Sequence, residues 1–193
     1  MNKQKYTIKI VLIYLFVFSI VLSCKNNKST TNVLLQEWTG PYGGVPAFDK
    51  MQVADIQSAV EQGMKENLEE IDAIANSTEA PTFENTIEAM ERSGSTLDNV
   101  FTYYGILSSN MSSPEFREVQ ARLAPKLSGF SSKISQNEKL FERIKTVYDN
   151  AQKTPLDDDQ QRVVELIYTG FAMRGAALDA EKKARYAAID KKL

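Results

Sequence analysis

Apolar side chains recur at every third or fourth position through most of this chain, from about Val53 onward. This spacing places them on one face of an α-helix, and no segment after the N-terminal apolar run alternates as a half-buried strand does. The pattern therefore predicts an all-α fold. Successive helices joined by short turns fold back on one another, so antiparallel helical hairpins are expected. The expected helices cover about 53–76, 82–104, 113–135, 137–148, 157–178 and 179–193.

Two small or rigid residues lie inside these expected helices. Gly94 is on the apolar stripe of the second helix, with Leu97 and Tyr104, where a small residue lets a neighbouring helix approach closely. Pro125 is inside the third helix, where it removes a hydrogen bond and clashes with the preceding turn, so a kink is expected near Ala121–Ala124. In the fifth helix the residues expected to face inward are Val163, Ile167, Phe171 and Leu178.

Glycines and prolines interrupt the segment from Leu34 to Asp49 and exclude a continuous helix or a central strand there. Three aromatic residues, Trp38, Tyr42 and Phe48, are spaced along it. Such a segment cannot bury its own rings, so it is expected to lie over the helices and to be anchored by these aromatics. A binding loop is the alternative interpretation.

Residues 1–23 have the features of a signal peptide. Basic residues precede an apolar run of 13 residues, Ile10–Leu22, which is shorter than the roughly 20 residues that span a bilayer. Val21–Cys24 resembles a bacterial lipobox, with a small residue before the cysteine. Cys24 is the only cysteine and has no partner for an internal disulfide, so lipidation at Cys24 accounts for it. The alternative is ordinary secretion, with an incidental Cys24.

The predicted organisation has three parts: a lipoprotein-type signal peptide (1–23), a flexible tether (24–33) and a helical domain (34–193). A protein of this kind is expected in the cell envelope, anchored through the lipid and facing the periplasm or the cell exterior. Loss of three lysines on cleavage takes the formal charge from −2 to −5. No basic patch compensates, which argues against nucleic-acid binding.

Histidine is absent from all 193 residues. Zinc sites of the HExxH, His₃ or Cys₂His type and Ser-His-Asp triads are therefore excluded. No catalytic, cofactor-binding or metal-binding residues are predicted in this chain.

Several short sequence motifs occur in an order that resembles a known family. The most distinctive is Pro81–Gly94, PTFENTIEAMERSG, preceded by Leu34–Phe48, LLQEWTGPYGGVPAF. Asn137–Tyr148, NEKLFERIKTVY, continues the likeness. Shorter matches are Pro125-Lys126-Leu127, Phe171-x-x-x-Gly175-Ala176-x-Leu178 and Arg185-x-x-x-Ile189. Together they resemble the N-terminal part of the thimet-oligopeptidase family of zinc metallopeptidases, closest to the bacterial peptidyl-dipeptidase (Dcp) branch.

The resemblance implies a particular architecture and activity. Members have two helical lobes that flank a channel with zinc on its floor, and the helices here would form part of one lobe. The full-length protein would be a zinc peptidase acting on oligopeptides. This chain is then expected to be an N-terminal fragment, inactive by itself, whose partner is the missing C-terminal catalytic region. The alternative is a non-enzymatic, lipid-anchored helical binding or scaffold module.

Three further groups of residues have a functional and a structural interpretation. Asp157–Asp159 lack the alternating ligands of a calcium loop and are expected to match the charge of a helix N-terminus. The glutamates at 66, 70, 84, 88 and 91 are expected to form solvated helix faces, because di-metal bundles use Glu-x-x-His pairs. Core packing is favoured over a channel lining for Tyr103, Tyr104 and Met111.

Overall fold

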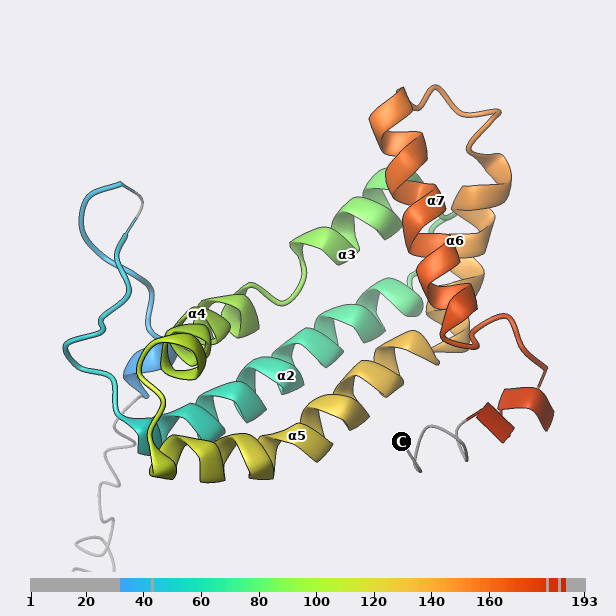
Figure 1. Cartoon of the computed structure of the whole chain (residues 1–193). Helices are drawn as coiled ribbons and strands as arrows, with labels where there is room; N and C mark the ends of the chain where they lie inside the picture. Colours follow the sequence, from blue (N-terminus) through green and yellow to red (C-terminus); the bar gives the residue numbers. More distant parts are fainter. Residues whose placement is uncertain (1–31, 43, 180, 184, 187–193) are drawn as a thin grey trace, which may run out of the picture. The chain divides into compact units, whose positions relative to one another are not determined.

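The computed structural model describes residues 32–42, 44–179, 181–183 and 185–186. Within them the regular secondary structure is helical, apart from an isolated bridge between Thr39 and Val45. The predicted all-α fold is confirmed. The elements are η1 (Val33–Leu35), α2 (Val53–Ala75), η2 (Phe83–Glu88), α3 (Ala89–Arg92), α4 (Ser95–Ser109), α5 (Pro114–Ser135), α6 (Glu138–Asn150) and α7 (Asp158–Met173) (Figure 1).

Helix starts follow the predicted capping residues. The Thr82 hydroxyl accepts from the backbone N–H of Asn85, and Asn85 Oδ1 accepts from the Thr82 N–H in return. Ser113 caps α5, and Asp157 caps α7. Each cap satisfies an N–H that has no partner inside its helix and contributes about 1 kcal/mol. Local sequence therefore fixes where the chain turns into the next helix.

The second expected helix is interrupted, which corrects the prediction of one helix over 82–104. The chain forms η2 and α3, leaves the helical conformation at Ser93, and begins α4 after Gly94. Gly94 has a φ of 83°, in the left-handed region that glycine adopts without strain. A Cβ there would lie 2.9 Å from Nδ2 of Asn67. The close approach expected at Gly94 is present, but at a break between helices.

Two hydrophobic clusters fill the described domain. The first joins α2, α4 and α5 and includes Ile56, Val60, Val100, Tyr103, Phe116 and Leu123. The second joins the C-terminal part of α2 with η2, α6 and α7 and includes Ile71, Ile87, Leu140, Ile144, Val164 and Phe171. Helix α2 contributes to both clusters, and Figure 1 shows it running beside α5.

Gly63 allows α2 and α4 to cross closely. A Cβ at Gly63 would lie 2.9 Å from the Cα of Leu97 in α4. The atom in the way belongs to the backbone, so no change of rotamer could relieve the contact. A salt bridge from Lys126 to Glu61 joins α2 to α5 at the surface. Two hydrogen bonds lower the pKa of the Glu61 carboxyl. The one from the Lys126 ammonium has the larger effect, and the one from the side-chain amide of Gln57 has the smaller.

Tyr103 anchors the N-terminal segment. Its ring is fully buried and meets the edges of Trp38 and Phe48, with ring centroids 6.3 Å and 5.3 Å away. Its hydroxyl accepts a 2.8 Å hydrogen bond from the backbone N–H of Ala47. Anchoring by Trp38 and Phe48 is therefore confirmed. The same prediction for Tyr42 is wrong, because Tyr42 is fully exposed.

The kink expected in α5 and the end expected for α7 have different outcomes. Helix α5 continues through Pro125, and Figure 1 shows its ribbon changing direction about halfway along. Helix α7 ends at Met173, and Gly175 follows with a φ of 88°. The prediction that the helix reaches Leu178 is wrong, because this glycine ends it. The inward positions predicted at Val163, Ile167 and Phe171 are confirmed, because all three pack against the second cluster, where Val164 is fully buried beside them.

Candidate functional site

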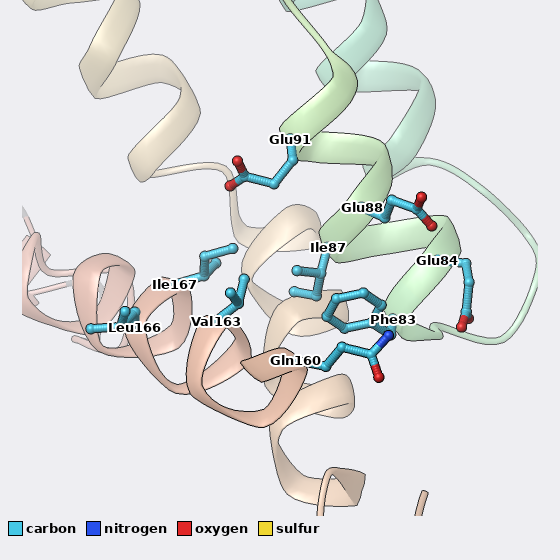
Figure 2. Close-up of a pocket in the computed structure, with 9 residues that line it drawn as sticks. All are labelled: Phe83, Glu84, Ile87, Glu88, Glu91, Gln160, Val163, Leu166 and Ile167. Atoms are coloured by element: carbon cyan, nitrogen blue, oxygen red, sulfur yellow. The ribbon is translucent and has the colours of Figure 1, made fainter. Parts of the chain in front are cut away.

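A groove lies between η2/α3 and α7. Its cavity measures about 500 Å³. The apolar lining residues are Phe83, Ile87, Val163, Leu166 and Ile167, and the polar ones are Glu84, Glu88, Glu91 and Gln160. Figure 2 shows Glu84 and Glu88 pointing away from Ile87 and Val163, whereas Glu91 extends toward the side of α7. The groove is therefore apolar along its length, with carboxylates at its rim.

The FENT segment builds one wall of this groove through a π-helical turn, η2. Asn85 Nδ2 donates to the carbonyl of Ala80, and Thr86 Oγ1 donates to Asn85 Oδ1. Thr86 and Ile87 are fully buried. Two hydrogen bonds lower the pKa of the Glu84 carboxyl. The one from the backbone N–H of Glu84 itself has the larger effect, and the one from the Thr82 hydroxyl has the smaller. π-helical turns are rare and are frequent at functional sites.

Arg143 of α6 holds the π turn and the preceding loop in place. The side chain is 6% exposed. Its Nη1 donates to the carbonyls of Ser77 and Glu79, at 3.1 and 2.9 Å. Its Nη2 donates to Asn85 Oδ1 at 2.9 Å and Thr86 Oγ1 at 3.2 Å. Four oxygens thus take the place of a counterion. This guanidinium therefore joins two family-like segments that are separate along the chain, FENT and NEKLFERIKTVY.

A hydrogen-bonded joint connects α2 to the break at Gly94. The Glu70 carboxylate accepts from the Gly94 N–H at 2.6 Å, and Asn67 Nδ2 donates to Ser93 Oγ at 3.1 Å. Asn67 is buried. Glu66 lies one turn earlier. Hydrogen bonds from the Gln62 amide and, with a smaller effect, from the Thr96 hydroxyl lower the pKa of the Glu66 carboxyl. Glu66 and Glu70, expected on a solvated face, therefore help to fix α4 against α2.

Asp157–Asp159 lie at the start of α7. Asp157 accepts from Gln160 N in a capping box, and Asp158 and Asp159 are exposed in the first turn of α7. The expectation of a helix cap is confirmed. In the described part of the chain, no group of three or more His, Cys, Asp or Glu side chains is placed to hold a metal ion.

The zinc implied by the family resemblance does not fit the described residues. Histidine is absent, and the acidic side chains form caps and single ion pairs in place of a convergent ligand set. No step of peptide hydrolysis can be derived from these residues.

The aromatic residues considered as a channel lining contribute to packing. Tyr103 is fully buried, and Tyr104 packs edge-on against Phe116 with centroids 5.2 Å apart. Core packing is confirmed for both. Met111 lies just past the end of α4, is 59% exposed and contributes to neither cluster, so the expectation of core packing is wrong for this residue. None of the three lines the groove beside η2.

Sequence reasoning missed three residues of this framework: Gly63, Asn67 and Arg143. A signal was present for each. Arg143 is on the same helical stripe as Leu140, Ile144 and Val147, so a charge interrupts an apolar face. Gly63 and Asn67 interrupt the apolar face of α2 in the same way. A polar or missing side chain on a buried stripe indicates a specific partner.

Comparison with known proteins identifies the class to which this helical domain belongs. The family model for the N-terminal domain of neurolysin and thimet oligopeptidase matches residues 56–183, from α2 to beyond α7. The chain therefore belongs to the thimet-oligopeptidase family. Within it, the match is to the N-terminal domain, which agrees with the absence of the family's zinc motif from these residues.

Individual relatives give the same result. A dipeptidyl carboxypeptidase of Salmonella typhimurium is 32% identical over 156 residues, which is 81% of this chain and 23% of the relative. The Escherichia coli dipeptidyl carboxypeptidase is 31% identical over 157 residues, with the same coverage. Oligopeptidase A of E. coli is 26% identical over 149 residues, 77% of this chain and 22% of the relative. The chain thus spans about a quarter of the length of these relatives.

Proposed function

We propose that this chain is the N-terminal, non-catalytic region of a zinc metallopeptidase that hydrolyses short peptides as a longer polypeptide. The match of residues 56–183 to the family's N-terminal domain is the observation that carries this proposal. The names of the first two relatives favour a peptidyl-dipeptidase over an endopeptidase. The zinc ligands and the general base would come from the region that follows the domain, since this chain has no histidine.

The helical domain would serve as part of one lobe beside the substrate channel. Such a wall must keep its shape when peptides enter, because misplacing a reactive bond by about 1 Å can cost a hundredfold in rate. The buried Arg143, the capping box at Thr82 and the close crossing at Gly63 each favour one fixed arrangement. These contacts support a scaffold role that needs no catalytic residue in the domain.

The encoded continuation of the polypeptide tests this proposal. Reading the gene past Leu193 should reveal an HExxH motif, and the longer polypeptide should cleave short peptides until a chelator removes its zinc. The purified 193-residue chain should bind no stoichiometric zinc and cleave nothing. A reading frame without HExxH would contradict the proposal and favour the non-enzymatic, lipid-anchored binding or scaffold module. Chelator-sensitive cleavage by the 193-residue chain itself would contradict both.

The proposal includes a lipid anchor on Cys24 at the cell envelope. Cys24 lies outside the described residues, as do the signal peptide (1–23) and residues 24–31 of the tether (24–33), and the support is the lipobox-like sequence Val21–Cys24. No helix in the described ranges is both long and apolar enough to cross a membrane.

Replacing the cysteine tests the anchor. Cys24→Ser should abolish incorporation of a fatty-acid label and move the protein from the membrane to the soluble fraction, because no second cysteine can take the lipid. Ser23→Ala keeps a small residue before Cys24 and should leave both unchanged. Wild-type protein that carries a free Cys24 thiol would show that the chain is secreted without a lipid.

A further inference from the structure

The apolar surface of α7 extends beyond the side chains that pack into the core. The inward face packs against the second hydrophobic cluster through Val163, Val164, Ile167, Tyr168 and Phe171. The adjoining side, which we call the outer face, carries Leu166, Gly170 and Met173. On it Leu166 is 53% and Met173 78% exposed. Exposed apolar side chains that continue beyond a buried face are typical of a surface that another element covers.

The outer face includes a glycine, Gly170, between Leu166 and Met173. A Cβ built at Gly170 would meet no heavy atom within 4 Å, so the backbone of α7 is open there. Gly63 shows what such a position does when it is covered, because it lets Leu97 of α4 approach the backbone of α2. Ridges of one helix pack into grooves of another at such points. Gly170 thus offers another helix a place of close approach.

The groove beside η2 adjoins the outer face, since Leu166 belongs to both (Figure 2). Its rim carries the carboxylates of Glu84, Glu88 and Glu91, of which Glu88 pairs with Arg92, and its lining includes no lysine or arginine. An occupant that matches this surface has an apolar stripe flanked by basic side chains, because carboxylates at a rim select a partner of opposite charge.

The length of the relatives identifies the source of the occupant. The matched family domain is N-terminal and includes all of α7, while the chain spans about 23% of the dipeptidyl carboxypeptidases. Most of such a polypeptide follows this domain. An exposed apolar stripe inside the matched domain is costly if it stays in water, about 25 cal/mol per Å² of apolar surface left unburied.

We propose that the outer face of α7 and the adjoining groove are covered by a helix from the region that follows Leu193, with an apolar stripe flanked by lysine or arginine. This inference rests on the proposed function, because it needs the longer polypeptide. It adds the place at which the N-terminal domain contacts the rest of the protein. Two other occupants, a second copy of the chain and a free peptide, are distinguished by the experiment.

The experiment compares thiol accessibility in the 193-residue chain and in the longer polypeptide. Leu166→Cys places a probe on the outer face, and Met111→Cys places one at a site that is 59% exposed and away from the groove. Maleimide labelling is followed at each site by peptide mass spectrometry. At position 166 labelling should be at least about tenfold slower in the longer polypeptide, because a covered thiol reacts only after local opening. At position 111 the two rates should agree.

Each remaining outcome overturns the inference in a distinct way. Equal labelling at position 166 in a longer polypeptide that retains peptidase activity shows that α7 stays uncovered, and leaves the proposed function standing. Protection in the 193-residue chain that increases with its concentration assigns the face to a second copy. Protection of the longer polypeptide only after oligopeptide is added assigns it to a peptide. A reading frame that stops at Leu193 removes both the inference and the proposed function.

Discussion

Arg143→Ala is expected to lower the free energy of unfolding by about 3 kcal/mol or more, since hydrogen bonds to a buried charged group are worth about 1.5–3 kcal/mol and unsatisfied acceptors add to the loss. The substitution leaves the carbonyls of Ser77 and Glu79, together with Asn85 and Thr86, without their shared donor. Urea titration of the purified chain, followed by circular dichroism, measures the loss.

Two variants separate the guanidinium network from loss of charge or of volume. Arg143→Lys keeps the charge but cannot donate to four oxygens in a plane, so it should recover only part of the stability. Arg162→Ala removes an exposed arginine that pairs with Glu165 on α7 and should change stability by less than about 0.5 kcal/mol. If Arg143→Ala is no more destabilising than Arg162→Ala, the network does not hold the π turn.

Gly63→Ala is expected to destabilise the domain by about 1–3 kcal/mol, the usual cost of overpacking a filled site. The added methyl group would lie 2.9 Å from the Cα of Leu97, so α2 and α4 must move apart. This loss outweighs the gain of roughly 0.5–1 kcal/mol that alanine brings over glycine inside a helix. Thermal and urea unfolding of the purified variant measure the net change.

Gly105→Ala is the matched control for the crossing of α2 and α4. Gly105 is inside α4, and a Cβ there meets no heavy atom within 4 Å. The same change should therefore stabilise the chain by about 0.5–1 kcal/mol, with a sign opposite to that at Gly63. Stabilisation by both substitutions would mean that the two helices are not in close contact at Gly63.

Helix positions could be predicted where a local signal decides them. Thr82, Ser113, Asn137 and Asp157 begin helices because each satisfies nearby backbone N–H groups, an interaction that needs only a few residues. The break at Gly94 was not predictable in this way. It depends on Asn67 and Glu70, which are more than twenty positions away. The apolar stripe continues through the break, so periodicity alone predicted one helix.

The groove depends on similar long-range contacts. The FENT segment, which forms one wall, was recognisable as a sequence motif. The conformation of this segment depends on hydrogen bonds from Arg143 in another helix. The other wall of the groove depends on which stripe of α7 faces inward. The alternation of apolar residues along α7 allows two answers, because Val163 and Val164 are both apolar neighbours. In the structure both valines pack against the second cluster, and contact with α6 and η2 buries Val164 completely and Val163 only in part.

The 23 residues of α2 carry side chains of both hydrophobic clusters. Because both clusters share α2, their unfolding is coupled. Neither cluster can lose α2 without exposing part of the other. Denaturant or heat is then expected to unfold the described region in one cooperative step, with no half surviving as an intermediate. Load applied at either end of α2 would likewise be transmitted along its axis to the opposite cluster.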